Sequence, residues 1–172
     1  MFNLFGSNVP EPRIINLEKP IFFVGMTLRT NTQKIGKDAK TLAKKMNMAK
    51  FREEIPHRRD PWAYVALSRN YNPTSGRLEY TLGDVVTHLG TNLPAGILGH
   101  EIPVGTYAIF TVKPGAFSWK RSITKLKEYI FTEWLPNSQY EHTGDFDEFE
   151  LHDARSMSSR PEIDLYVPVK LR

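Results

Sequence analysis

Cysteine is absent from the 172-residue chain. Its absence excludes disulfide bonds, thiolate metal sites and a catalytic cysteine. A chain without disulfides is compatible with the cytoplasm, which is where we expect this protein. No apolar run approaches the ~20 residues that a membrane-spanning helix needs. Residues 1–6 also lack the basic start and the apolar length of a signal peptide. The sequence therefore predicts no association with a membrane.

Recognised catalytic and cofactor motifs are missing as well. The chain holds no Ser-His-Asp arrangement, phosphate-binding loop or dinucleotide fingerprint, so we expect no cofactor. Four possible ligands, His142, Asp147, His152 and Asp153, are close in sequence, but their spacing is not typical of a metal site. We therefore predict that the protein holds no metal ion.

Charge of one sign is only slightly in excess, because 23 Lys and Arg residues against 19 Asp and Glu residues give a net charge of +4. Most of the excess lies on one face of a helix predicted over residues 34–50, where apolar residues recur in steps of three and four. The lysines of this face are Lys34, Lys37, Lys40, Lys44, Lys45 and Lys50. No second recognition helix follows, so we interpret the face as solvated surface rather than a nucleic-acid site.

Aromatic residues are plentiful. Ten Phe, seven Tyr and three Trp make up 12% of the chain, which is enough for a core and a lined pocket. Strands are predicted over residues 13–29, 62–69, 77–88, 102–112, 146–153 and 163–169. Pro20 makes the first of them an edge or bulged strand, and Gly83 breaks the third.

A second amphipathic helix is predicted from residue 118 to Leu135, since Pro136 disfavours a helical residue before it. We interpret residues 51–61 as a loop and residues 90–101 as a connector. The order strand, helix, strand, strand then occurs twice. The fold class is therefore α+β, built from two βαββ repeats that bury their apolar faces on one another.

The predicted halves cover residues 13–90 and 102–170 of a single domain, and residues 1–12 form a leader. A cleft between the two halves is the natural place for a ligand. Little residue identity links the halves, so the repeat is one of element order and spacing.

The strand over residues 146–153 places carboxylates beside aromatic side chains. Phe149 and Leu151 point to one face of it. The opposite face carries Glu148, Glu150 and His152. A carboxylate is thereby predicted near Trp134 and Tyr140. A buried carboxylate among aromatic rings can receive an organic cation or transfer protons.

Seven short stretches share their order and spacing with one known family. They are residues 61–64, 78–83, 93–96, 102–110, 133–140, 149–151 and 163–169. Together they span nearly the whole chain and resemble the GyrI-like effector-binding domain. This domain is the ligand-binding module at the end of multidrug-sensing transcription activators, and it also occurs as a stand-alone protein.

The resemblance implies two βαββ halves about a pseudo-twofold axis, with antiparallel sheets, two main helices and a ligand cleft between the halves. Ligands of the family tend to be amphipathic aromatic cations held by aromatic rings around a central glutamate, which corresponds to Glu150. His152 departs from the family pattern, in which a tyrosine is usual. We expect ligand contacts from Glu150, Trp134, Tyr64, Tyr80, Tyr107, Phe110, His152 and Tyr140. Trp62 and Trp119 are interpreted as core and Glu148 as rim.

The leading hypothesis is a protein that binds a small aromatic cation, and two alternatives stay open. Some stand-alone family members resemble hydrolases of cyclopropane-bearing genotoxins. In that case Glu150 would orient or deprotonate water, and the hydroxyl of a tyrosine, Tyr107, would polarise the leaving carbonyl. The family's name-giving member is associated with DNA gyrase, so a protein partner is the third hypothesis, with the lysine face as its only surface hint. No DNA-binding module precedes the domain, so we expect no direct DNA contact.

Overall fold

The computed structural model describes residues 11–48, 51–113 and 119–172. Within them the strands are β1 (Arg13–Leu17), β2 (Ile21–Asn31), β3 (Tyr64–Arg69), β4 (Arg77–Val86), β5 (Leu98–Ile102), β6 (Gly105–Val112), β7 (Tyr140–His142), β8 (Glu148–His152) and β9 (Ile163–Leu171). The helical segments are α1 (Ile35–Met48), α2 (Phe51–Glu54), α3 (Trp119–Tyr129), the π-helical turn η1 (Ile130–Trp134), α4 (Leu135–Asn137) and the 3-10 turn η2 (Ala154–Met157). The predicted α+β class is confirmed. Most of the predicted leader, residues 1–10, lies outside the described residues, as does Lys50 of the lysine face.

One curved antiparallel sheet organises the molecule, in the order β1-β6-β9-β8-β3-β4-β2-β5, with β7 paired to β9. The strands of the two halves meet where β3 pairs with β8. Outward from this junction the first half runs β3-β4-β2 and the second half β8-β9-β6, so each half has the same strand order. The pseudo-twofold axis itself stays a prediction.

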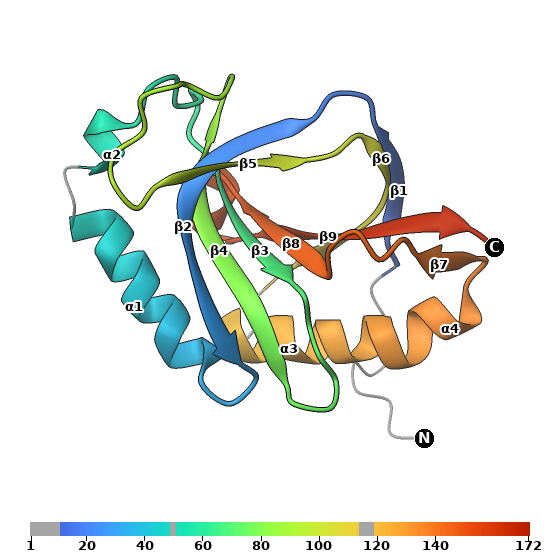
Figure 1. The fold of residues 1–172 in the computed structure, drawn as a ribbon. Helices are drawn as coiled ribbons and strands as arrows, with labels where there is room; N and C mark the ends of the chain where they lie inside the picture. The colour runs from blue at the N-terminus through green and yellow to red at the C-terminus, as the bar shows by residue number, and fades with distance from the viewer. Residues whose placement is uncertain (1–10, 49–50, 114–118) are drawn as a thin grey trace.

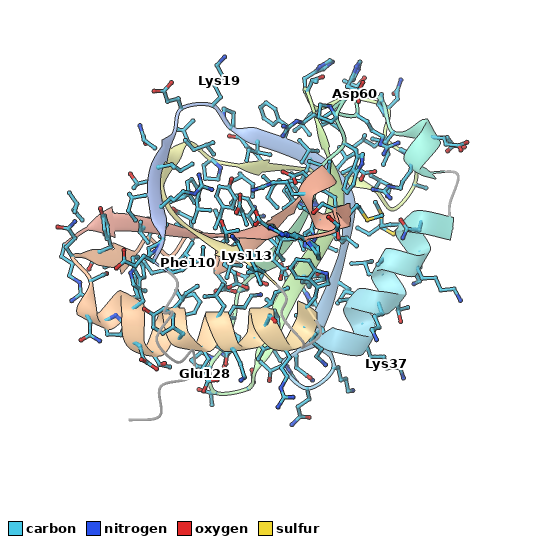
Figure 2. The ribbon with its side chains drawn as sticks, turned by 180° about the vertical axis from the view of Figure 1, so that it is seen from behind. Lys19, Lys37, Asp60, Phe110, Lys113 and Glu128 are labelled. Carbon is cyan, nitrogen blue, oxygen red and sulfur yellow. The ribbon has the colours of Figure 1, made fainter. Side chains whose placement is uncertain are left out.

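Three apolar clusters pack against the sheet, one on its inner face and two on its outer face. One fills its inner face and includes Phe23, Leu67 and Phe149. The outer face carries the other two, one with residues of α3 and one with residues of α1. Figure 1 shows the curled sheet with α1 and α3 along its outer side. In Figure 2 the side chains of Lys37 and Glu128 project outward from these helices, whereas Phe110 lies in the interior.

The amphipathic stripe of α1 explains its place on the sheet. Leu42 and Met46, one turn apart, are 4% and 3% exposed and pack in the outer cluster beneath the helix. Burial of each such side chain stabilises the fold by about 1.5–3 kcal/mol. None of the helices in the described part of the chain is long and apolar enough to cross a membrane.

The predicted break of a strand at Gly83 is wrong, because β4 runs through it without interruption. Gly83 lies directly opposite Gly25 of β2. A Cβ atom on Gly83 would collide with the carbonyl oxygen of Val24, and one on Gly25 with that of Leu82. The two glycines therefore allow the backbones of β2 and β4 to approach closely.

The predicted helix end at Leu135 is also wrong, since the helix continues through η1 and α4. The N–H of Leu135 donates to the carbonyl of Ile130, five residues back, which is a π-helical bond. Pro136 has no N–H to donate, and the side-chain amide of Asn137 donates to the carbonyl of Glu133 at 2.7 Å. The helix thus passes the proline through a wider turn.

Two further segments differ from the prediction. The expected connector over residues 90–101 contains most of β5, which extends the sheet beside β2. The expected loop over residues 51–61 begins with the short helix α2. The glycines of residues 90–101 led us to predict a connector instead of β5. The helix α2 was missed because its four residues are too few for a periodic pattern.

Candidate functional site

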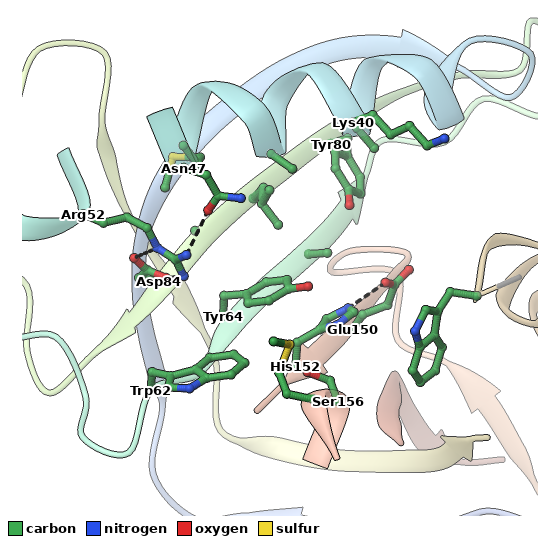
Figure 3. A pocket seen from close by; sticks show the side chains of 18 of the residues that line it. Lys40, Asn47, Arg52, Trp62, Tyr64, Tyr80, Asp84, Glu150, His152 and Ser156 are labelled. Carbon is green, nitrogen blue, oxygen red and sulfur yellow. Dashed lines mark hydrogen bonds and ion pairs between the residues drawn. The ribbon is translucent and has the colours of Figure 1, made fainter. Parts of the chain in front are cut away.

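A cavity of about 740 Å³ lies where α1 and the start of α3 approach the outer face of β3, β4 and β8. Aromatic and ionisable side chains gather in it, as Figure 3 shows. The side chains that line it include Trp62, Tyr64, Tyr80, Trp119, Glu150 and His152. Residues that are far apart in the sequence therefore line the same cavity.

Strand alternation places Glu150 in this cavity. Phe149 and Leu151 turn to the inner cluster, so the residue between them faces the helices. Its neighbour across the strand pair is Ala66 of β3. Because the alanine side chain is small, it leaves space above the sheet beside the carboxylate.

The carboxylate of Glu150 is buried but not alone. Its side chain is 11% exposed, its Oε2 accepts a hydrogen bond from His152 Nε2 at 3.1 Å, and its Oε1 lies 3.5 Å from Lys127 Nζ. Burial by itself would raise the pKa of Glu150, but the hydrogen bond from His152 and the charge of Lys127 outweigh it and hold the pKa below its ordinary value. The carboxylate is therefore ionised at neutral pH. Since an ionised carboxylate only accepts, His152 Nε2 carries the hydrogen.

Lys127 of α3 is shared between two carboxylates. Its Nζ lies 2.6 Å from Glu148 Oε1 as well as near Glu150. Burial would lower the pKa of Lys127, but the two carboxylates raise it above the ordinary lysine value. Two negative charges on one positive charge leave this group of three with one net negative charge. The interpretation of Glu148 as rim is wrong, because its side chain is only 7% exposed and is ion-paired.

Three nearly parallel rings form part of the cavity wall. Tyr64 packs against Trp62, which lies two residues before it and just ahead of β3, with ring centroids 6.1 Å apart and planes at 9°. It packs against His152 across to β8, at 4.3 Å and 10°. Burial, with the nearby charge of Glu150, raises the pKa of Tyr64 to about 12, and the same two causes raise the pKa of Tyr80. Both hydroxyls are therefore neutral donors at neutral pH.

A second polar group lies at the α2 side of the cavity. Asp84 of β4 is 3% exposed and accepts hydrogen bonds from Arg52 Nε at 2.9 Å and Arg52 Nη2 at 2.6 Å. Arg58 Nε lies 3.4 Å from the same carboxylate. Both guanidinium groups also line the cavity.

Four of the eight predicted contact residues line this cavity, namely Glu150, Tyr64, Tyr80 and His152. The other four lie elsewhere. Tyr107 is 2% exposed in the inner cluster, on the other face of the sheet from Glu150, and its hydroxyl donates to the carbonyl of Pro103 at 2.7 Å. Phe110 is fully buried in the cluster that contains residues of α3.

Trp134 and Tyr140 do not line the cavity either. They stack on each other at 6.2 Å, and Trp134 meets Phe110 edge-on at 5.1 Å. Both line a smaller hollow of about 430 Å³ beside Pro12 and Ile14. The chain therefore brings neither of them, nor the Tyr107 of the hydrolase hypothesis, to Glu150.

Three residues of the site were not predicted. Trp62 and Trp119 were expected in the core, and both are half-buried and line the cavity, although Trp119 also packs against the cluster beneath α3. Lys127 was not singled out, although it follows Ile123 by four residues and so lies on the helix face that meets the sheet. A lysine within an apolar stripe, with two acidic residues on a central strand, is the signal that could have found it.

Among the described residues there is no group of three or more His, Asp or Glu side chains that could hold a metal ion. The carboxylates of the cavity, Asp84 and Glu150, are engaged with arginine, lysine and histidine instead. The arrangement can neutralise and orient a charged organic molecule between aromatic rings.

The described residues thus form an α+β fold with a cavity between its helices and its sheet. The chain belongs to the family of integron-associated effector binding proteins, Cass2, whose model matches residues 13–169. The resemblance inferred from the sequence is thereby confirmed. No curated protein matches the sequence.

Solved structures agree with this assignment of the fold. An integron cassette protein from the mobile metagenome of Vibrio cholerae is 13% identical, with a TM-score of 0.63 over 93% of this chain and 96% of that chain. SAV2435 bound to tetraphenylphosphonium is 12% identical, with a TM-score of 0.67 over 93% and 94% of the two chains. The C-terminal domain of EcmrR is 13% identical, with a TM-score of 0.64 over 96% and 100%.

Proposed function

We propose that this protein binds a small aromatic organic cation in the cavity between α1, α3 and the sheet. The observation that carries the proposal is the ionised carboxylate of Glu150 beside the aromatic side chains that line that cavity. A volume of about 740 Å³ is within the usual range of sites for small organic molecules, about 300–1,000 Å³.

The charge balance supports a cation rather than a neutral ligand. Glu148, Lys127 and Glu150 together carry one net negative charge in a largely buried place. Leaving such a charge unbalanced away from water is costly. A ligand cation beside Glu150 balances it without displacing Lys127 from Glu148.

The rings supply the remaining affinity. A desolvated contact between a cation and an aromatic ring contributes about 2 kcal/mol. Tyr80, Trp62 and Trp119 offer such rings around the cavity. A few of these contacts with apolar burial reach the roughly 8 kcal/mol of a micromolar complex. SAV2435, which has a similar fold, was solved with a lipophilic aromatic cation.

Calorimetric titration of tetraphenylphosphonium into the wild type and the Glu150→Gln variant tests the proposal. We expect the variant to bind at least about tenfold more weakly, since a loss of about 1.4 kcal/mol is a factor of ten. Glu141→Gln is the matched control, because Glu141 of β7 is an exposed carboxylate paired with Lys170 and does not line the cavity. Equal affinity in the wild type and Glu150→Gln would falsify the proposal. Thermal melts of both variants check that they are folded.

A further inference from the structure

The end of the cavity opposite Glu150 holds more positive charge than the fold requires. Arg52 already binds Asp84 in a fork, with its Nε on one carboxylate oxygen and its Nη2 on the other. This bidentate pair satisfies both oxygens of a carboxylate that is 3% exposed. Arg52 therefore accounts for the burial of Asp84 on its own.

Arg58 supplies the positive charge that Asp84 does not balance. Its Nε lies 3.4 Å from the Asp84 carboxylate, and its Nη1 donates to the backbone carbonyl of Arg52 at 3.1 Å. Two guanidinium groups on one carboxylate leave this cluster with one net positive charge. The side chains of Arg52 and Arg58 are 31% and 34% exposed, so the charge is accessible from the cavity.

The two charged groups lie at different ends of one cavity. Figure 3 shows Arg52 with Asp84 at one end, Glu150 with His152 at the other, and the ring of Tyr64 between them. One end has one net negative charge and the other one net positive charge. A ligand with a cationic group alone would balance the first end and leave the positive charge of the second end without an anionic partner from the ligand.

We propose that the ligand of this site is a zwitterion: an aromatic molecule with its cationic group at Glu150 and a carboxylate at Arg58. The inference rests on the proposed function and adds the anionic group to it. A guanidinium group is suited to a carboxylate because its planar N–H donors match the two oxygens. Asn47 of α1 accepts from Arg52 Nη1 at 2.9 Å, so all three nitrogens of that guanidinium are engaged within the protein. Arg58 uses Nε and Nη1 for contacts within the protein, and we assign its Nη2 to the ligand.

Two dyes test the inference, rhodamine B and its ethyl ester, which share one xanthylium cation and differ in a free or an esterified carboxyl group. Fluorescence titration of each dye is carried out on the wild type, Arg58→Gln and Arg59→Gln. Arg59 is the matched control, since it is the exposed neighbour of Arg58 and does not line the cavity.

We expect the wild type to bind the acid about tenfold more tightly than the ester. Arg58→Gln should bring the ratio to about one and leave the affinity for the ester within about twofold, since the ester lacks the charge that the guanidinium attracts. Arg59→Gln should keep the wild-type ratio.

Equal affinity of the wild type for acid and ester, or an unchanged ratio in Arg58→Gln, would overturn the inference. The failure of the proposed function is a different result. In that case the ester binds the wild type and Glu150→Gln equally, or does not bind at all. An ester that binds in a Glu150-dependent way, with no preference for the acid, leaves the proposed function standing and refutes the zwitterion.

Discussion

At the scale of single residues, Lys127 decides the charge of the cavity. It balances Glu148 at 2.6 Å and reaches Glu150 at 3.5 Å, so one ammonium group serves two carboxylates that are 7% and 11% exposed. A cation that enters the cavity supplements this balance, because Lys127 remains with Glu148. The site combines a stable ion pair with an excess charge that a ligand can use.

Replacing Lys127 by methionine should destabilise the fold, because it leaves two buried carboxylates without a cation. Breaking a buried pair in this way costs about 3–5 kcal/mol, measured by urea unfolding at pH 7. Without the ammonium, the pKa of Glu150 rises relative to the wild type, because a positive charge that lowers it is lost. A raised pKa means that the loss is largest at neutral pH and shrinks toward acid pH.

The control for this prediction is the double variant Lys127→Met with Glu148→Gln. It removes one of the two charges, so we expect it to regain part of the stability at pH 7. A single variant as stable as the wild type, or a deficit that grows toward acid pH, would contradict this account of Lys127.

At the scale of elements, β2 and β4 depend on the facing glycines Gly25 and Gly83. At each glycine, a carbonyl group of the other strand occupies the space that a Cβ atom would need. Gly83 also lines the cavity. The close approach of the two strands thus shapes both the sheet and the wall of the site.

Gly83→Ala should lower the free energy of unfolding by about 3 kcal/mol or more, because a backbone carbonyl cannot move away as a side chain can. Gly99→Ala on β5 is the matched control. The nearest atom to a Cβ there is Leu89 Cδ2 at 3.0 Å, at the end of a flexible and exposed side chain. We expect a change of less than about 1 kcal/mol, and urea unfolding of both variants measures the difference. Similar losses in the two variants would show that the carbonyl contact is unimportant.

The spacing of apolar residues predicted the elements that have an apolar stripe. It failed for elements that depend on contacts with other parts of the chain or on local hydrogen bonds. The helix over residues 34–50 and the alternation of Phe149, Glu150 and Leu151 follow from spacing alone. The strand β5 and the continuation past Pro136 do not, because the strand depends on pairing with β2 and the helix continues through a π-helical turn. Neither contact is visible in the local sequence.

At the scale of the whole molecule, the cavity exists because the two halves of the chain meet at β3 and β8. The register places Tyr64 opposite His152 and Ala66 opposite Glu150. These pairs join residues far apart in the sequence. The repeated element order predicts a cleft between two halves, which stays a prediction, and the residues that line the observed cavity depend on this register.

The same reasoning explains which predicted contacts lie elsewhere. Tyr107 is on a strand whose alternation turns it to the inner face. Trp134 and Tyr140 are near the far end of the long helix, away from the start of α3 that reaches the cavity. A motif match assigned all three to one site, whereas the fold distributes them over two faces of the sheet.

The position of a bound cation tests the central claim most directly. A crystal structure of the protein with tetraphenylphosphonium should show the phosphorus atom in the cavity between α1 and α3, with Glu150 as its nearest carboxylate and phenyl rings against Tyr80, Trp62 or Trp119. The opposite result is a cation in the smaller hollow beside Trp134 and Tyr140, with the cavity at Glu150 unchanged. That result would contradict the account, because the ligand would then be held without the carboxylate.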